Sequence, residues 1–507
     1  MSAMALAAAK YKIHFKRFVV IAALIILIIP ALILLKHFYP PRNHHNGSSH
    51  NITLALNKAL LLFDAQKSGP FVENSLIRFR GNSGMNDGSS SEKHLDLVGG
   101  FYDAGNNIKF RFTTAYTVTL LSWTVIKYHE KYENIGELEH VKDIIKWGSL
   151  YLLKLFVPPN NSFNTSARIY SQVGGNNSNS ENDLTCWQRP EDMNYIRRVS
   201  VCDISTASDL AGEMVAAISA ASLVLKEDKD ISEKFVKAAE ELFILASSTK
   251  KKGTYTTNDE CGGQARQFYN SISYKDELVW GGIWLFFATG NKTYLKYAIE
   301  NFPSAVKEQV ASDEGILLTR IRYFQDLGYP YESSFISSTN KIDLLMCSYT
   351  SDPKYSTTKG GLILLKPSTD AALLQYAVTA SFLSKLYSDY LQLLRTTRRS
   401  CSNSVFSSES LQEFSQSQVN YILGDNPLKM SYVVGYGDTY PVQVHHRAAS
   451  IPWDEKRRTY TEGNQWLNSK MANPNTILGA MVAGPNKDDV FFGRKDSTMV
   501  HRAKYSK

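Results

Sequence analysis

The chain has 507 residues, of which 43% are hydrophobic and 12% aromatic, and its formal net charge is +8. This length and composition indicate a globular protein that can bury one large core or two medium ones. The first 63 residues hold seven Lys and Arg residues and no acid, so the rest of the chain is nearly neutral. A basic nucleic-acid-binding face is therefore not expected, and nucleic acid is excluded as a partner.

The first predicted element is a membrane-spanning helix. Residues 18–35 read FVVIAALIILIIPALILL, an uncharged apolar run close to the roughly 20 residues that cross a bilayer. Pro30 is tolerated inside a membrane helix. A cleaved signal peptide is the alternative, but the apolar run is longer than such a peptide needs, and no clear small-x-small cleavage site follows it.

The charges before this helix predict its orientation. They are four bases, Lys10, Lys12, Lys16 and Arg17. Because positive segments stay in the cytosol, we expect a cytosolic tail at residues 1–17, a signal anchor at residues 18–36 and a luminal or extracellular C-terminal domain. The expected protein is a single-pass type II protein of the plasma membrane or secretory pathway, with the lipid bilayer as a partner.

A linker follows the predicted anchor. Residues 37–50 are rich in Pro, Asn and Ser, and the folded domain is expected to begin near Asn51. Six N-x-Ser/Thr sequons agree with a luminal domain and are the expected glycosylation sites. They are Asn46, Asn51, Asn160, Asn164, Asn176 and Asn291.

The rest of the chain has mostly helical apolar spacing, and strand-like alternation is rare. The predicted helical segments are 52–68, 116–132, 138–156, 207–228, 234–248, 275–290, 291–302, 374–394 and 411–424. Helices of similar length without intervening strands indicate an all-α fold, either a helical barrel or a solenoid. No 34- or 40-residue period is visible, which disfavours standard repeat arrays.

The cysteine pattern predicts neither a metal nor another cofactor. The five cysteines, Cys186, Cys202, Cys261, Cys347 and Cys401, include no C-x-x-C pair. In an oxidising lumen, Cys186 and Cys202 are a candidate disulfide.

The loop at residues 97–110, LVGGFYDAGNNIKF, combines the residue types of a catalytic turn. Its glycines bend the backbone, its aromatics such as Tyr102 are suited to line a cleft, and Asp103 and Asn106 stand three residues apart. A turn that holds a water molecule for attack is better served by two carboxylates than by one. The residues leave open whether this loop is catalytic or has lost its activity.

A second polar segment, residues 171–195, carries candidate sugar-binding side chains. Trp187 is suited to stack on a sugar face, and Arg189 and Glu191 are suited to hydrogen-bond hydroxyl groups. The alternative is structural, because the stretch 190–192 is also a typical helix start.

A third segment, residues 423–452, ends in two histidines and an arginine. His445 is suited to orient a hydroxyl group or stabilise developing charge, and Arg447 is suited to bind a pair of oxygens. A structural role for one of the two histidines, His445 or His446, is the alternative. A metal site would need a third ligand that the sequence does not indicate.

Together these motifs resemble plant members of glycoside hydrolase family 9, in particular the Korrigan-type membrane-anchored endo-1,4-β-glucanases. The resemblance rests on LVGGFYDAGNNIKF, CWQRPEDM, NYILGDNP, VHHRAASIP and NPNTILGAMVAGP, which follow the family's order. It implies an (α/α)6 barrel whose long loops form an open cleft, in a catalytic domain at residues 51–490. It also implies inverting hydrolysis of β-1,4-glucan in cell-wall polysaccharide metabolism, with one carboxylate as base and a second as acid.

The resemblance implies roles for single residues. The family's turn reads Asp-Ala-Gly-Asp, where the second aspartate is the main base; here Asp103 keeps the first position and Asn106 replaces the second. An amide orients water but does not take its proton at neutral pH. His445 is the implied catalytic histidine, whereas Leu184 stands in place of another family histidine. The implied substrate-binding residues are Tyr102, Trp187, Arg189, Glu191, His446 and Arg447.

The C-terminal part departs from the family pattern. Alignment on the Gly-Pro pair of the last motif puts Gly493 where the family has an aspartate and Arg502 where it has the acid glutamate. Arginine does not donate the proton that a leaving glucose oxygen requires. Residues 491–507 form an atypical basic tail, and a Trp-bearing segment of the relatives is missing after Asn301.

Two functions from different classes follow. The first is a membrane-anchored endoglucanase that acts on β-1,4-glucan. The second is a catalytically inactive descendant that binds glucan or a membrane protein complex, since the proton-transfer residues are replaced while cleft residues are kept. A frameshift or a wrong exon after Pro485 is a further explanation for the tail, but it does not explain Asn106, Leu184 or the missing segment.

Overall fold

The computed structural model describes the chain in the ranges 50–71, 75–89, 95–159, 166–176, 182–308, 333–350, 355–365, 373–401, 404–454 and 456–493. The predicted tail, anchor and nearly all of the linker lie outside the described residues, as do Asn46, Asn160, Asn164 and Arg502. Within the described ranges, no helix is long and apolar enough to span a membrane. The elements below belong to a compact unit that begins at Asn51.

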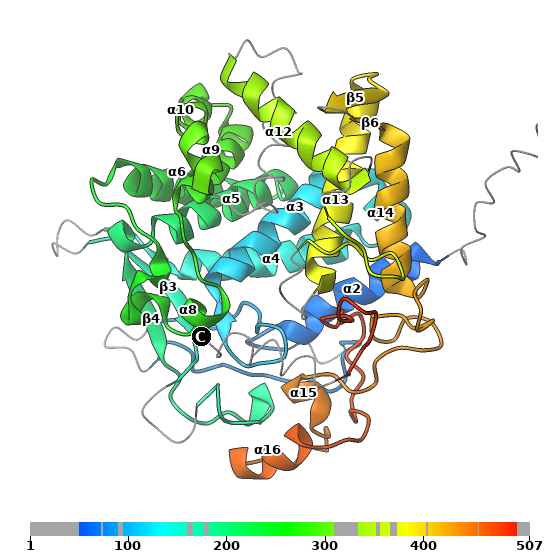
Figure 1. The fold of residues 1–507 in the computed structure, drawn as a ribbon. Helices are drawn as coiled ribbons and strands as arrows, with labels where there is room; N and C mark the ends of the chain where they lie inside the picture. The colour runs from blue at the N-terminus through cyan, green and yellow to red at the C-terminus, as the bar shows by residue number, and fades with distance from the viewer. Residues whose placement is uncertain are drawn as a thin grey trace, which may run out of the picture. The chain divides into compact units, whose positions relative to one another are not determined.

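Most of this unit is helical (Figure 1). The long helices are α2 (Ile52–Gln66), α3 (Arg111–Asn134), α4 (Leu138–Lys154), α5 (Ser208–Val224), α6 (Lys229–Ser248), α9 (Lys275–Thr289), α10 (Lys292–Glu308), α12 (Ser333–Thr350), α13 (Leu373–Leu393) and α14 (Ser408–Leu423). Short helices are α7 (Asp259–Gly262), α8 (Ala265–Phe268), α15 (Arg447–Ser450) and α16 (Tyr460–Leu467). Every predicted helical segment overlaps one of these helices, so the helix-rich prediction is confirmed, although α12 was not predicted.

Helix α5 is the central element of the core. All of its residues except Leu223 are buried, and it packs against α3, α6 and α9. Glycines permit the close approach of α5 and α9: a Cβ atom on Gly212 would lie 2.5 Å from the carbonyl carbon of Glu277. A Cβ atom on Gly281 would lie 2.6 Å from the carbonyl oxygen of Gly212. Larger side chains would therefore separate the two helices.

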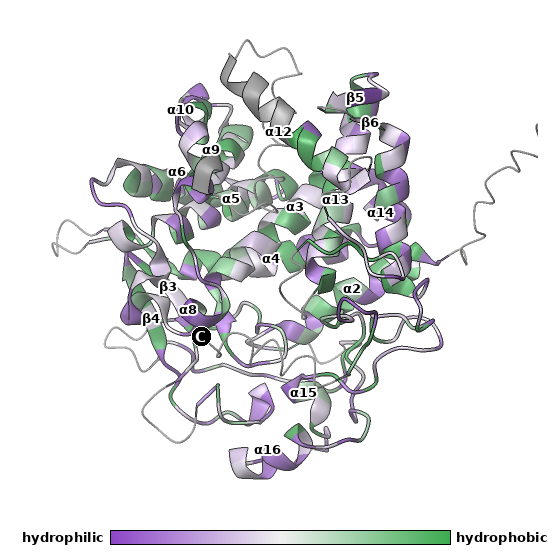
Figure 2. Cartoon of the chain, in the orientation of Figure 1, coloured by the Kyte–Doolittle hydropathy of each residue, from purple (hydrophilic) through white to green (hydrophobic). Residues whose placement is uncertain are grey.

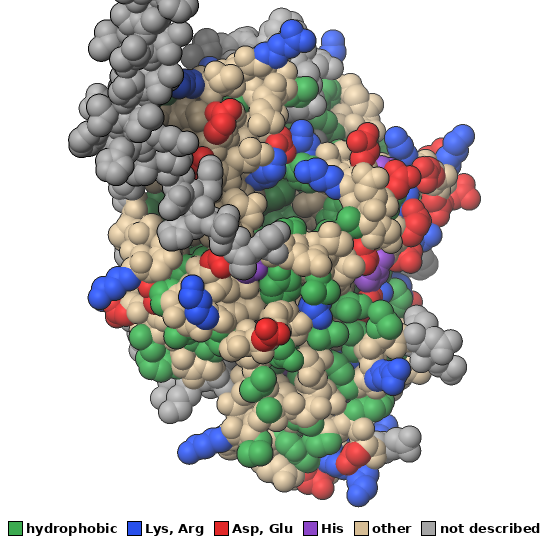
Figure 3. All heavy atoms as spheres, turned by 90° about the vertical axis from the view of Figure 1, so that its right-hand side faces the viewer, with side chains coloured by type: hydrophobic (Ala, Val, Ile, Leu, Met, Phe, Trp, Pro, Cys, Tyr) green, Lys and Arg blue, Asp and Glu red, His purple; other side chains and the backbone are tan. Residues whose placement is uncertain are grey.

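Hydrophobic residues are concentrated on the helices that pack against one another, whereas α16 is mainly hydrophilic (Figure 2). On the face shown in Figure 3, acidic and basic side chains are interspersed, and hydrophobic side chains gather in the lower half. The central helix α5 is buried on nearly all sides, and α9 is buried along Leu278–Phe286, as expected of helices in the core of a large domain.

A small antiparallel sheet, which the all-α prediction omitted, lies beside the helices. Its strand β3 (Arg168–Val173) pairs with β1 (Lys109–Phe110), β2 (Phe156–Val157) and β4 (Val199–Asp203). Lys109 lies opposite Val173, so the sheet fixes the C-terminal end of the loop at residues 97–110. A separate hairpin joins β5 (Arg398–Cys401) and β6 (Ser404–Ser407). Such short strands carry too little alternation to be read from the sequence.

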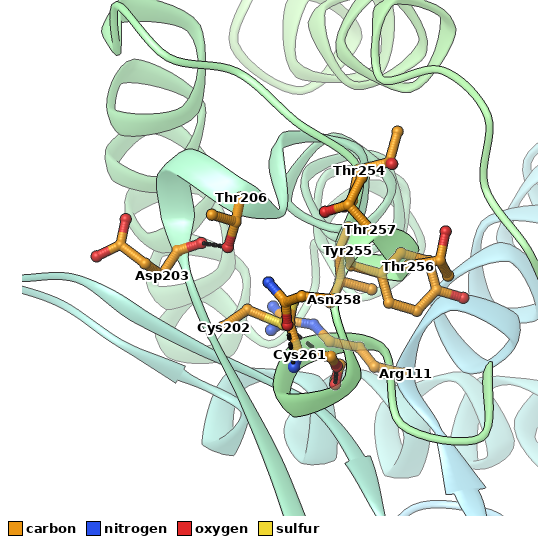
Figure 4. Close-up of a disulfide and its surroundings, with 12 residues drawn as sticks. Arg111, Cys202, Asp203, Thr206, Thr254, Tyr255, Thr256, Thr257, Asn258 and Cys261 are labelled. Carbon is orange, nitrogen blue, oxygen red and sulfur yellow. Dashed lines mark hydrogen bonds between the residues drawn. A yellow bond between two sulfur atoms is a disulfide. The ribbon is translucent and has the colours of Figure 1, made fainter. Parts of the chain in front are cut away.

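Two disulfides connect these elements. Cys202 of β4 is bonded to Cys261 of α7, with Arg111 and the Thr254–Asn258 turn around the bond (Figure 4). Cys347 of α12 is bonded to Cys401 of β5. The predicted pairing of Cys186 with Cys202 is therefore wrong, because Cys202 lies against α7, whereas Cys186 is a buried thiol whose sulfur accepts a hydrogen bond from the Asn182 amide.

Candidate functional site

The loop at residues 97–110 forms a tight turn around Asp103. The backbone N–H of Asp103 donates to the Ile108 carbonyl at 2.9 Å, and the backbone N–H of Asn106 donates to the Asp103 carbonyl at 3.0 Å. Ala104 has a φ of 43°, in the left-handed region that non-glycine residues rarely adopt. A strained residue of this kind often marks a functional turn, because surrounding contacts must hold it in place.

Both carboxylate oxygens of Asp103 accept side-chain hydrogen bonds. The Tyr269 hydroxyl donates to Oδ1 at 2.7 Å, and Nδ2 of Asn106 donates to Oδ2 at 3.2 Å. Oδ1 of Asn106 in turn accepts the Ile108 amide proton at 2.7 Å. Asp103 and Asn106 are both partly exposed. The turn therefore presents one oriented carboxylate to solvent, and the side-chain amide of Asn106 holds this carboxylate in place.

Tyr269 follows helix α8, and its role was not predicted from the sequence. Its ring packs edge-on against Phe110 with centroids 5.1 Å apart, and its carbonyl accepts the Tyr255 hydroxyl proton at 2.8 Å. Burial, together with the charge of Asp103, raises the pKa of Tyr269 well above its ordinary value. The hydroxyl therefore stays protonated and acts as a donor toward Asp103.

The histidine segment packs directly against the turn. The Arg447 amide donates to the Gly105 carbonyl at 3.1 Å. A Cβ atom on Gly105 would overlap the carbonyl oxygen of His445, so this contact requires a glycine. The His445 ring lies 4.7 Å from the Trp187 ring, tilted by 57°. The structure thus brings Asp103 and Asn106, predicted from one motif, and His445, predicted from another, into one region.

His446 has an internal position that fits the structural alternative. Its Nδ1 accepts the Ala449 amide proton at 3.1 Å, capping helix α15, so Nε2 carries the proton and donates to Oε1 of Gln66 at 3.0 Å. Burial lowers the pKa of His446 to about 3, helped by the nearby Arg80 charge. The side chain amide of Gln66 also donates to the Ala104 carbonyl, so neutral His446 supports the turn through Gln66.

Trp187 and Arg447 are also directed inward. Trp187 is only 2% exposed, and its Nε1 donates to the Ser450 hydroxyl at 2.9 Å. The Arg447 guanidinium lies 5.0 Å from the Trp187 ring centroid and donates to the carbonyls of Cys186 and Asp183 at 3.0 and 2.8 Å. The predicted substrate-binding role of these two residues stays a prediction, and their described contacts are with the protein.

Arg189 and Glu191 form buried ion pairs. Arg189 donates to both oxygens of Asp192 at 2.8 and 2.9 Å. Glu191 accepts from Nε of Arg80 at 2.7 Å and from the Gly81 amide at 3.1 Å. The intervening 190–192 stretch is a short 3-10 helix with Pro at its start, as the structural alternative predicted.

Beneath the turn lies a buried charge network that fixes the loop ends. Lys109 pairs with Asp87 at 2.7 Å and donates to the carbonyls of Leu97 and Gly99 at 2.9 and 2.8 Å. Burial lowers the pKa of Lys109 to about 8, although the charge of Asp87 opposes this shift. Arg197 also pairs with Asp87, at 2.7 Å. This network closes the loop that carries Asp103.

Arg197 and Tyr102 also support the loop from below. Arg197 donates to the Asn107 carbonyl and lies 3.4 Å from the Asp183 carboxylate. Tyr102 is 4% exposed, with the guanidinium groups of Arg80 and Arg197 at 5.6 and 5.7 Å from its ring centroid. Burial raises the pKa of Tyr102 to about 12. The described contacts of Tyr102 are with the protein, and its substrate-binding role stays a prediction.

The described C-terminal end is held by Asp489. Its carboxylate accepts the Tyr421 hydroxyl proton and the Gly360 amide proton, the latter at 2.7 Å. Gly493 follows with a φ of 65°, and no atom lies within 4 Å of the position that a Cβ atom would take. The predicted acid position, Arg502, lies outside the described residues. Across the described ranges, no group of three or more His, Cys, Asp and Glu side chains is arranged to hold a metal ion.

Known proteins are similar to this chain in sequence and in fold. A family model described as glycosyl hydrolase family 9 matches residues 53–502. Endoglucanase 10 of Oryza sativa subsp. japonica is 45% identical over 462 residues, which cover 87% of this chain and 72% of that protein. The resemblance inferred from the motifs is thereby confirmed.

Solved structures of endoglucanases are similar to this chain in fold. The endoglucanase of the termite Nasutitermes takasagoensis aligns with a TM-score of 0.74 and 27% identity, covering 90% of this chain and 97% of that one. Endoglucanase CelQ of Clostridium thermocellum, solved with cellotetraose, aligns with a TM-score of 0.69 and 25% identity, covering 90% of this chain and 69% of that one.

Proposed function

Because the chain belongs to glycosyl hydrolase family 9, we propose that it acts on β-1,4-glucan, with the Asp103 turn at the centre of the site. The observation that carries this proposal is the oriented carboxylate of Asp103, held by Tyr269 and Asn106. The cellotetraose bound by CelQ supports the choice of substrate. We also propose that the helices form an (α/α)6 barrel with an open cleft.

In the proposed inverting reaction, Asp103 is the group that activates water. It takes a proton from a water molecule, whose oxygen attacks the anomeric carbon from the face opposite the leaving oxygen. Asn106 holds Asp103 in place, but its amide does not act as a general base. The bond between the anomeric carbon and the leaving oxygen breaks, and solvent water supplies a proton to that oxygen, because the aligned Arg502 does not give one. A general acid or base step contributes roughly 10²–10⁴-fold, so we expect turnover well below that of relatives with both carboxylates.

A second candidate function is a catalytically inactive protein that binds glucan or a membrane protein complex. The observation that favours it is Asn106, which occupies the position of the main base and donates its amide proton to Asp103. The contacts of Gly105, Lys109 and Gln66 preserve the turn regardless of this change. A binding surface is therefore kept where proton transfer is weakened.

Reducing-end release from amorphous cellulose by the full-length protein distinguishes these functions. The matched variant is Asp103→Ala, and both proteins are also tested for glucan binding. Turnover that is lost in the variant supports hydrolysis with Asp103 as base. Glucan binding without turnover in either protein supports the inactive alternative. A folded protein that neither binds nor cleaves glucan overturns the proposal.

We further propose that the protein is a single-pass type II membrane protein with residues 18–36 as its anchor. Two disulfides support an oxidising compartment for the folded unit. The described sequon residues Asn51, Asn176 and Asn291 are exposed, which supports their glycosylation. In intact microsomes the domain should resist added protease, and removal of N-glycans should lower its mass. Digestion of the domain in sealed vesicles would contradict this topology.

A further inference from the structure

Trp453 differs from the other tryptophans in its exposure. The sequence has seven tryptophans, and all lie in the described ranges. Trp453 is 39% exposed, whereas Trp123, Trp187, Trp280 and Trp284 are buried and the remaining two are intermediate. The aromatic residue available to solvent is thus not Trp187, which the sequence suggested for sugar stacking. An exposed tryptophan ring offers apolar surface to a ligand.

The Trp453 ring is held in place by its neighbours. The Arg189 guanidinium lies 5.1 Å from the ring centroid, close enough for a cation–π contact. Arg189 is itself fixed, since it pairs with Asp192 and donates to the carbonyls of Pro452 and Lys456 at 2.9 and 2.6 Å. The ring therefore has a defined orientation before any ligand arrives.

Gly81 leaves room for the edge of the Trp453 ring. A Cβ atom on Gly81 would lie 3.0 Å from Cη2 of Trp453. The neighbouring Arg80 lies 5.6 Å from the Tyr102 ring centroid, and Tyr102 directly precedes Asp103. Trp453 is thus linked to the Asp103 turn by a short chain of contacts.

The backbone gives a second link between Trp453 and the turn. Arg447, at the start of α15, donates its amide proton to Gly105, and Trp453 comes six residues later. Six residues span at most roughly 22 Å. Trp453 is therefore within the length of a short glucan oligomer from Asp103. Figure 1 shows α15 and α16, which flank this segment, among the loops at one end of the helices.

We propose that Trp453 is a stacking platform for a glucosyl ring of a β-1,4-glucan chain that runs across the Asp103 turn. This inference rests on the proposed function and adds a binding position to it. The ring faces of β-linked glucose carry C–H groups and are apolar, so an aromatic ring covers them favourably. A tryptophan with few rotatable bonds, already fixed by Arg189, loses little conformational entropy on binding.

Acrylamide quenching of tryptophan fluorescence in the full-length protein tests this proposal. Because Trp453 is the most exposed tryptophan, it should dominate the quenching, and cellohexaose should protect it. In Trp453→Phe the sugar-dependent protection should disappear. The affinity for cellohexaose, measured by calorimetry, should fall roughly tenfold in Trp453→Ala and much less in Trp453→Phe. Met471→Ala, which truncates a side chain that is 76% exposed, should change neither quantity.

The outcomes separate this inference from the proposed function. If the unaltered protein binds cellohexaose and Trp453→Ala binds it equally well, the platform is wrong and the proposed function stands. If the unaltered protein does not bind cellohexaose, the proposed function fails and the platform with it. The unfolding midpoint of each variant is measured in parallel, and a weakened Trp453→Ala with an unchanged midpoint supports direct contact. Equal loss in Trp453→Phe and Trp453→Ala would overturn stacking as the cause.

Discussion

The hydroxyl of Tyr269 donates a 2.7 Å hydrogen bond to Oδ1 of Asp103, although the two residues are 166 positions apart in the sequence. The bond places one donor on the side of the carboxylate opposite Asn106, which donates to Oδ2. Asp103 is thereby held in one orientation, as a residue that activates water must be.

Replacement of Tyr269 by Phe should weaken turnover of glucan more than it weakens folding. The ring and its contact with Phe110 remain, but the hydrogen bond to Asp103 is lost. A hydrogen bond to a charged group contributes about 1.5–3 kcal/mol, which corresponds to roughly 10- to 100-fold in rate. Reducing-end release and the unfolding midpoint are measured together. An unchanged rate would show that Tyr269 does not position the carboxylate.

Replacement of Asn106 by Asp should increase glucan hydrolysis. The new carboxylate occupies the base position of the family pattern, and general base catalysis contributes roughly 10²–10⁴-fold. Initial rates on amorphous cellulose are compared for the unaltered protein and Asn106→Asp. Asn106→Gln is the matched control, because it keeps the amide and should give no increase. A rate in Asn106→Asp no higher than in the control would locate the defect elsewhere, such as the missing acid.

Replacement of Gly105 by Ala should destabilise the protein. The added methyl group would overlap the His445 carbonyl oxygen, and overpacking of this kind costs about 1–3 kcal/mol. Urea unfolding of the full-length protein measures the change. Ala104→Gly is the neighbouring control: it relieves the unfavourable φ of 43° and should change the free energy of unfolding by no more than about 1 kcal/mol. Equal effects of the two changes would refute the close contact.

The stability of the folded unit should decrease as the pH rises past the ordinary histidine pKa of 6.5, through His140 on α4. Its Nε2 lies 2.8 Å from Asp64 on α2, and its Nδ1 lies 2.8 Å from Glu137. The hydrogen bond to Asp64 raises the pKa of His140 above its ordinary value of 6.5; partial burial opposes this shift and Glu137 reinforces it. Because the folded state binds the proton more tightly, the stabilisation is complete below the unfolded pKa and is lost as the pH rises through the folded pKa.

Urea unfolding at about pH 6 and about pH 9 tests the role of His140. The unaltered protein should lose more unfolding free energy between these conditions than His140→Gln does. Histidines outside this cluster are unchanged in the variant, so the difference reports His140. The same loss in both proteins would assign the pH dependence to other groups.

The sequence was sufficient for the long helices because their apolar residues repeat over many turns. It was not sufficient for α12, which is rich in Ser and Thr, or for the strands around β3, which are too short to show alternation. Asp103 and Asn106 were recognisable within one motif. Tyr269 was missed because it reaches the site from a distant loop with no motif of its own. Internal partners decide whether a polar side chain faces a ligand, and those of Arg189 and Glu191 became visible only in three dimensions.

Besides the side-chain bonds of Asn106, the Asp103 turn is shaped by contacts to its backbone from other residues. Lys109, Arg197 and Gln66 bind backbone carbonyls of the loop, and Gly105 packs on the His445 backbone. Asparagine and aspartate codons differ by one nucleotide, so a single nucleotide change exchanges amide for carboxylate while these backbone contacts keep their residues. A single mutation is therefore enough to remove or restore the catalytic base at position 106. We expect proteins that carry either residue to share one fold.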